Sequence, residues 1–137
     1  MKPEEFVRSI YLGDRACKAI LIEGWKRRVS IQVDVLSRLK PGTTAWDFYT
    51  GGDINDGWIV FSDVQQMCFD PSGPIPNDLF NELTVTPVHA GKESIYLFQM
   101  WIGSVNDTGK TEEVHLRIEA RRIHLEDPAR PGIEITA

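Results

Sequence analysis

The stretch Glu112-Glu113-Val114-His115-Leu116-Arg117-Ile118-Glu119-Ala120 decides between a helical and a β-rich fold. Its apolar residues alternate with charged or polar ones. On a helix, with about 100° between successive residues, these apolar side chains would fall into two groups on opposite sides. On a strand they all share one face. The pattern therefore predicts a half-buried strand.

Downstream of this strand the alternation changes phase at Arg121-Arg122. We expect a bulge there that returns Ile123 and Leu125 to the core side. Upstream, residues 94–102 form a long apolar run that predicts another strand. Residues 84–88 predict an edge strand, because Pro87 has no N–H to donate to a neighbouring strand.

The first half of the chain repeats the alternating pattern. Residues 29–35 alternate apolar and polar side chains, which predicts a half-buried strand. Residues 18–23 are apolar on both faces, as in a central strand, and we expect a hairpin across residues 24–27. Strands are also expected at 58–61 and 64–69, with a bulge at residues 62–63.

Helical signals are few. Pro3 suits the first position of a helix, Phe6 and Ile10 are spaced for one apolar face, and Gly13 can end it. Residues 77–83 could form one further helical turn. The length of 137 residues predicts a single domain. We therefore expect a mainly β protein, an antiparallel curved sheet or sandwich with one short N-terminal helix.

The charge is unevenly spread over the chain. The net charge is −5, and residues 41–91 contain no Lys or Arg. An acidic stretch without bases repels nucleic acid and favours a basic partner. No run of about 18 apolar residues predicts a membrane span. No secretory signal is apparent, and the two distant cysteines, Cys17 and Cys68, are expected to be reduced and largely buried, as in a cytoplasmic protein.

No motif predicts a catalytic residue, a cofactor or a metal. Residues 103–111 resemble a phosphate-binding loop, but there is one residue too many between the glycines and a strand follows. Residues 53–57 depart from the spacing of a calcium loop, leaving at most a loose site. The three histidines have no metal-ligand spacing, and a hydrolase elbow is absent.

The four tryptophans divide into two pairs. Trp58 and Trp101 lie inside apolar strands and are predicted to be in the core. Trp25 and Trp46 lie beside turns. Such a residue either covers one end of the core or marks a partner surface.

Several stretches resemble known families. Residues 5–15 and 69–78 are similar to a family of small uncharacterised bacterial proteins. Residues 61–64 and 119–121 more loosely resemble β-rich immunity proteins of bacterial toxin systems. Neither resemblance implies a functional residue.

The leading hypothesis is a non-enzymatic, immunity-like protein-binding module. Asp47, Asp53 and Asp56 would meet a basic partner protein, and Trp46 would be the apolar anchor. One alternative is a small-ligand-binding domain or enzyme with a pocket at one end of the sheet. Another is a structural homo-oligomer joined through the edge strand at residues 84–88.

Overall fold

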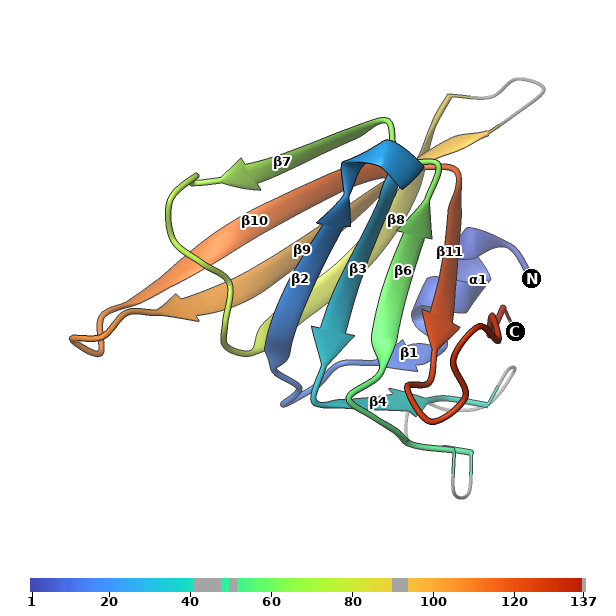
Figure 1. Ribbon diagram of the computed structural model, residues 1–137, viewed down its shortest axis with the longest axis horizontal. Helices are drawn as coiled ribbons and strands as arrows, with labels where there is room; N and C mark the ends of the chain where they lie inside the picture. The colour runs from blue at the N-terminus through green and yellow to red at the C-terminus, as the bar shows by residue number, and fades with distance from the viewer. Residues whose placement is uncertain (41–47, 50–51, 90–93, 137) are drawn as a thin grey trace.

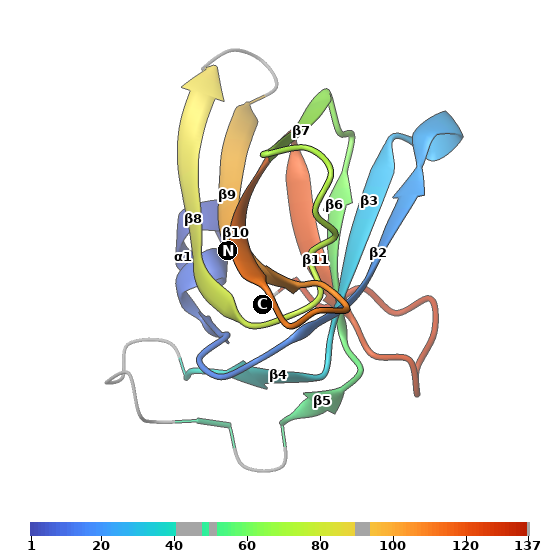
Figure 2. The same ribbon diagram turned by 90° about the vertical axis from the view of Figure 1, so that its left-hand side faces the viewer.

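The computed structural model describes residues 1–40, 48–49, 52–89 and 94–136, and its main body is two antiparallel four-stranded sheets packed face to face (Figures 1 and 2). The predicted mainly β, antiparallel fold with one short N-terminal helix is confirmed, and of the two architectures expected, curved sheet or sandwich, it is the sandwich. The first sheet has the order β11-β6-β3-β2. Its strands are β2 Cys17–Glu23, β3 Arg28–Val33, β6 Trp58–Ser62 and β11 Arg122–Glu126. The second sheet has the order β7-β10-β9-β8. Its strands are β7 Gln66–Asp70, β8 Phe80–His89, β9 Ile95–Val105 and β10 Thr111–Ala120.

A small third sheet closes one end of the sandwich (Figure 2). It has the order β1-β4-β5, with bounds Ile10–Tyr11, Val35–Arg38 and Ile54–Asn55. The predicted helix is present as α1, Pro3–Arg8, and packs against β8. It ends earlier than Gly13, because Ile10 already pairs with Arg38 of β4.

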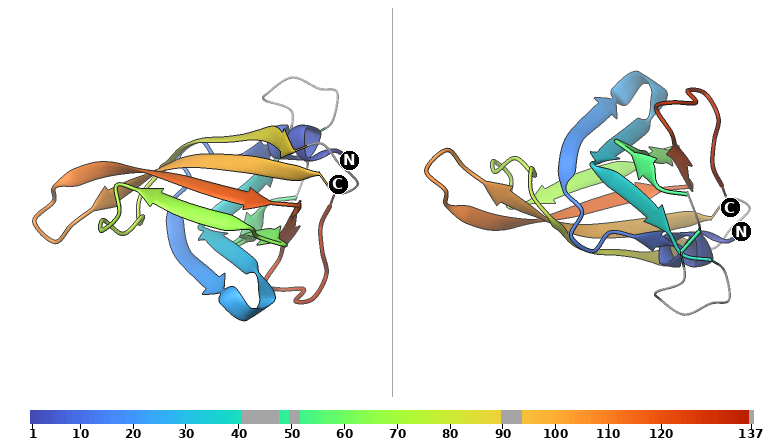
Figure 3. Two further views of the ribbon diagram at one scale, coloured as in Figure 1. Left: turned by 90° about the horizontal axis from the view of Figure 1, so that it is seen from above. Right: turned by 90° about the horizontal axis from the view of Figure 1, so that it is seen from below.

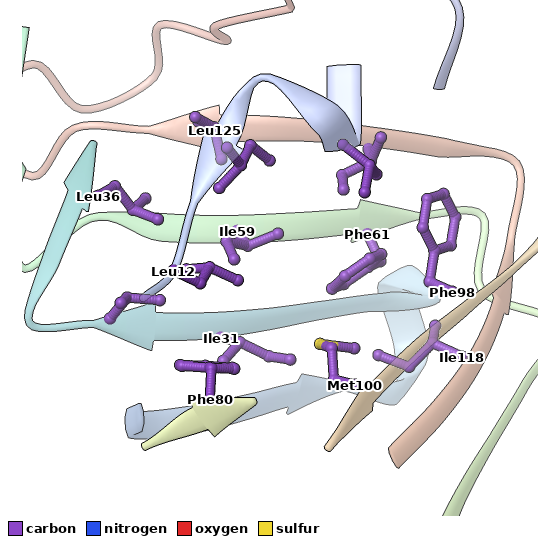
Figure 4. Packing of buried hydrophobic residues seen from close by; sticks show 14 of the residues in the cluster. Leu12, Ile31, Leu36, Ile59, Phe61, Phe80, Phe98, Met100, Ile118 and Leu125 are labelled. Carbon is purple, nitrogen blue, oxygen red and sulfur yellow. The ribbon is translucent and has the colours of Figure 1, made fainter. Parts of the chain in front are cut away.

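The alternating stretches bury the faces that the sequence predicts, except at the end of 29–35. That stretch is not one strand, because β3 ends at Val33 and the half-buried Val35 begins β4 of the third sheet. On β10, the side chains of Val114, Leu116, Ile118 and Ala120 are all fully buried. On the first sheet, Ile31 of β3 lies opposite Ile59 of β6, and both are fully buried. Apolar side chains from the two sheets meet between them (Figure 4).

The predicted bulges at 121–122 and 62–63 are wrong, because the chain changes sheet at both places. The β10 strand ends at Ala120 in the second sheet, and the next strand, β11, belongs to the first sheet. Likewise β6 belongs to the first sheet and the next strand, β7, belongs to the second. The two crossings are tied together by the N–H of Arg121, which donates to Ser62 O at 3.3 Å. The strands of the two sheets run obliquely across each other (Figure 3), so a phase change in the alternation here marks a sheet corner.

Other local predictions also need correction. Residues 18–23, predicted as a central strand, form β2 at an edge of the first sheet, whereas β8 with Pro87 is at an edge as predicted. The predicted helical turn at 77–83 is absent, since the side-chain amide of Asn77 bonds both main-chain groups of Val105 and β8 starts at Phe80.

Three predicted core side chains are not in the core. Trp58 and Trp101 are half-buried on the outer faces of their sheets, because the residues beside them on each strand, such as Ile59 and Met100, take the inward positions. Cys17 is buried as expected, but Cys68 is exposed.

Candidate functional site

The predicted acidic site is only partly described by the structure. Asp53 is exposed just before β5, and Asp56 lies in the turn just after it. The Asp56 carboxylate lies 2.6 Å from the ammonium group of Lys18. Trp46 and Asp47 lie outside the described residues. Asp53 and Asp56 therefore flank one short strand, and Asp56 already has a basic neighbour within the chain.

The outer edges of the two large sheets differ in how they are protected. The β11 edge is covered by the C-terminal segment, where Leu125 and Ile135 exchange two main-chain hydrogen bonds of 2.9 Å. The β8 edge carries Pro87 and two irregularities of register. On the β7 edge, the exposed side chains of Gln66, Cys68 and Asp70 alternate with partly buried ones. These are devices that keep a sheet edge from pairing with another chain.

The β2 edge is covered only at its start. There the N–H of Cys17 donates to Asp78 O, and the register with β3 is irregular between Cys17 and Ala19. The centre of this edge is Ala19-Ile20-Leu21-Ile22, with no charge and no proline. Leu21 is 47% exposed and Ile22 is 56% exposed. An apolar, exposed edge strand is a template for pairing with a strand of another chain.

The tip of the β2–β3 hairpin extends this surface. A single 3₁₀ turn, Gly24–Lys26, joins the two strands, and Arg27 closes it in the left-handed conformation with φ of 50°. Trp25 within this turn is 101% exposed and so covers no part of the core. We call Leu21, Ile22, Trp25, Lys26 and Arg27 the hairpin surface. A groove of about 280 Å³ lies beside it, with Val64 and Met67 on its other side.

A second hollow lies where the chain changes sheet. This end pocket has a volume of about 510 Å³. Phe6, Tyr96 and Ile123 give it apolar surface, and its charged lining includes Arg122 and Glu134. The Arg122 guanidinium lies 2.8 Å from the carboxylate of Asp63, which also lines the pocket. The lining therefore carries both signs of charge.

A buried histidine forms part of the end pocket. His124 is 3% exposed, and its Nε2 lies 3.0 Å from Oε1 of Glu126. The same oxygen accepts a hydrogen bond of 2.5 Å from Arg28. On the other side of the ring, Nδ1 lies 3.9 Å from a carboxylate oxygen of Glu134. Because an ionised carboxylate only accepts hydrogen bonds, Nε2 carries a proton and Nδ1 faces Glu134.

The electrostatics of this cluster favour an ionised Glu126. Burial raises the pKa of its carboxyl, but hydrogen bonds from His124 and Arg28 outweigh that effect. The pKa of Glu126 therefore lies below its ordinary value of 4.5. The charged carboxylate of Glu126 fixes the orientation of the His124 ring, because the hydrogen bond that one ring nitrogen makes determines which nitrogen carries the proton.

The outer face of the second sheet carries a further histidine. His115 is half-buried, and its ring is stacked on Trp101 with centroids 4.5 Å apart. Its Nε2 lies 2.8 Å from the side-chain oxygen of Gln99. These contacts hold the His115 ring against the outer face of the sheet. His115 lines neither the groove beside the hairpin surface nor the end pocket.

Comparison with known proteins places the chain in a family. The profile of a family of unknown function, DUF6258, matches residues 1–137. The chain belongs to DUF6258. No curated protein and no solved structure gives a significant match. The predicted resemblance to an uncharacterised family is thereby confirmed, while the bacterial origin and the likeness to immunity proteins stay predictions.

Sequence reasoning missed two features of this DUF6258 chain. The His124–Glu126–Arg28 cluster joins residues far apart in the chain, so no local motif announces it. Trp25 beside a turn was a usable signal, but only the structure shows that it covers no core. Among the described residues, no three His, Cys, Asp or Glu side chains cluster as metal ligands, and no helix is long and apolar enough to cross a membrane.

Proposed function

We propose that this chain is a non-enzymatic protein-binding module that binds an extended segment of a partner protein along β2. The observation that carries the proposal is the uncovered apolar stretch of the β2 edge from Ala19 to Ile22, close in the chain to the fully exposed Trp25. Strand addition supplies affinity through main-chain hydrogen bonds and specificity through alternate side chains. A large exposed aromatic residue at one end of the edge suits a binding anchor, the role that the sequence suggested for Trp46.

The charges at the two ends of β2 define the partner segment. Lys26 and Arg27 lie at the hairpin tip, where Lys26 lies 3.3 Å from the carboxylate of Glu23. At the opposite end of the strand Asp56 pairs with Lys18, and Asp53 lies three residues before Asp56. The partner segment that fits is apolar in its middle, acidic at the end that meets Trp25, and basic at the end that meets the aspartates. In this arrangement Asp53 and Asp56 still meet basic groups of the partner, as the sequence predicts, but only at one end of the bound segment.

The free state of the two cysteines fits an intracellular protein. Cys17 and Cys68 are both free thiols. Burial raises the pKa of the Cys17 thiol to about 11, and a hydrogen bond to the backbone of Ala19 offsets this only in part. Unpaired cysteines are usual in a reducing compartment. We propose a cytoplasmic module of bacterial origin whose activity is binding itself, as in the immunity proteins that residues 61–64 and 119–121 suggest.

A partner titration tests this function. The chain is used to capture proteins from its native lysate, and each retained protein is purified and titrated against three chains by calorimetry. These are wild type, an Ile22→Thr/Trp25→Ser variant, and a control, Val88→Thr, on the exposed edge of β8. We expect about 30-fold weaker binding for the hairpin variant, because an aromatic anchor buried on binding contributes about 2 kcal/mol.

Two outcomes would count against this assignment. Equal affinity of the hairpin variant and wild type would show that the partner binds elsewhere. Loss of binding only in Val88→Thr would move the site to β8. An Asp53→Asn/Asp56→Asn variant adds a check on the basic end of the partner, because it should slow association at low salt and have little effect at high salt.

The end pocket supports a second candidate function, binding of a small molecule. The buried His124 and the mixed charges of the lining favour a zwitterionic ligand such as an amino acid. A ligand that binds only the folded state raises the melting temperature. We expect one of the twenty amino acids at millimolar concentration to raise the melting temperature of wild type and not that of a Tyr96→Ala/Glu134→Gln variant. No shift with any of them would exclude this class of ligand.

A further inference from the structure

The buried histidine of the end pocket leaves one ring nitrogen without a hydrogen-bond partner. His124 is 3% exposed and lines the pocket together with Glu134. Its Nε2 donates to the carboxylate of Glu126 at 3.0 Å, and its Nδ1 lies 3.9 Å from the carboxylate of Glu134. The second distance is too long for a hydrogen bond, so a proton on Nδ1 would have no acceptor among the described residues. Nδ1 is therefore an unprotonated acceptor on the side of the ring that faces Glu134.

Glu134 supplies a second acceptor beside this nitrogen. Its side chain is 62% exposed, and no Lys or Arg of the described residues forms an ion pair with it. The other acid of the lining, Asp63, is already paired with Arg122 at 2.8 Å. Within the described part of the lining, the acid without a basic neighbour is therefore Glu134, next to Nδ1 of His124.

The spacing of the two acceptors defines the chemical group that fits between them. A nitrogen placed about 2.8 Å from each of two atoms that are 3.9 Å apart makes hydrogen bonds at about 90° to each other. The N–H groups of one ammonium reach this angle with small bends. A primary ammonium can therefore donate to both acceptors, and its charge offsets that of Glu134. A carboxylate in the same place would bring further acceptors and a second negative charge.

We propose that the end pocket binds the ammonium group of a primary amine between His124 Nδ1 and Glu134, with the apolar part of the ligand against Phe6, Tyr96 and Ile123. The proposal rests on the second candidate function, since it names the ligand class of the same pocket. The pocket volume of about 510 Å³ is in the range of small-ligand sites and holds an aromatic ring on a short chain. An amino acid is one member of this class, and the ammonium is the group that the pocket selects.

Calorimetric titration of the full chain with matched probes tests the proposal. Phenylethylamine, phenylalanine and 3-phenylpropionate have the same aromatic ring on a short chain. The first carries an ammonium, the third a carboxylate, and phenylalanine both. At neutral pH we expect phenylethylamine and phenylalanine to bind, and 3-phenylpropionate to bind at least about tenfold more weakly, because it cannot make the two charge-assisted hydrogen bonds.

A variant and a spectroscopic measurement locate the ammonium. Glu134→Gln, at an exposed position, should weaken binding of phenylethylamine about fivefold and should not weaken binding of 3-phenylpropionate. The control Glu112→Gln removes an exposed carboxylate that does not line the end pocket and should bind like wild type. Nitrogen NMR of the three histidines needs no substitution, and phenylethylamine should move the signal of His124 Nδ1, whereas 3-phenylpropionate should not.

Three other results would overturn the proposal. Equal affinity for 3-phenylpropionate and phenylethylamine would show that the pocket binds small molecules but does not select an ammonium. Equal affinity of Glu134→Gln and wild type for phenylethylamine would place the ammonium elsewhere. No binding of phenylethylamine at millimolar concentration would rule out the proposed ligand class, and the melting-temperature screen then decides on the pocket separately. The protein-binding function is tested independently, because Ile22 and Trp25 do not line this pocket.

Discussion

Replacing Phe61 by alanine is expected to lower the free energy of unfolding by about 3–5 kcal/mol. Phe61 is fully buried on β6, and its ring lies 5.0 Å from the ring of Phe98 on β9 of the opposite sheet. Figure 4 shows the two side chains next to each other in the core, and their ring planes are tilted by 60°. Removing the ring loses its burial and its contact with Phe98, and the rigid sheets can close the cavity only in part.

The measurement is urea unfolding followed by tryptophan fluorescence. Domains of this size are stable by about 5–15 kcal/mol, so a loss of this size would remove much of the total. Ile75→Ala is a suitable control, because Ile75 is 74% exposed, and we expect a change within about 0.5 kcal/mol. A cost for Phe61→Ala as small as that of Ile75→Ala would contradict the packing of the two sheets through these rings.

Replacing Glu126 by glutamine is expected to cost about 1–2 kcal/mol at neutral pH. The Glu126 carboxylate accepts from Arg28 at 2.5 Å and lies 3.0 Å from Nε2 of His124. A hydrogen bond to a charged group contributes about 1.5–3 kcal/mol, and the partial exposure of Arg28 and Glu126 reduces this. Glutamine keeps the shape of the side chain but removes the charge that both partners face.

The cost should depend on pH in a defined direction. The pKa of Glu126 in the folded chain is lowered below 4.5, because the hydrogen bonds outweigh burial. A lowered pKa stabilises the fold above the unfolded value, and that stability is lost as the pH falls through the folded pKa. The difference between wild type and Glu126→Gln should therefore be full at pH 7 and shrink as the pH falls from about 4.5 towards 2.

Urea unfolding at a series of pH values measures this difference. Glu112→Gln, at an exposed position on β10, is the control and should show no such pH dependence. A difference that stays constant between pH 7 and 2 would show that the charge of Glu126 does not stabilise the fold. Arg28→Met should remove much of the difference, because the two side chains share one hydrogen bond.

Much of the fold could be predicted from the residues alone. The alternation in 29–35 and 112–120 is a local property of the chain, since neighbouring side chains on a strand point to opposite faces. It correctly predicted the buried faces of β3 and β10, but not that the chain leaves the first sheet after Val33 and that Val35 belongs to β4. The same local logic failed at 121–122, where a phase change looked like a bulge and is a crossing between sheets. The residues of one strand do not show which sheet the next strand in the chain will join.

The candidate sites depended more on long-range pairing. Residues 18–23 are apolar enough for a central strand, and only the sheet order shows that they lie at an edge and expose Leu21 and Ile22. Arg28 and Glu126 are 98 positions apart in the chain and meet only because both strands belong to the first sheet. The sequence by itself determined which face of each strand is apolar, because that depends on neighbours along the chain. The tertiary structure alone decided which apolar side chains remain in water, because that depends on which strands find partners.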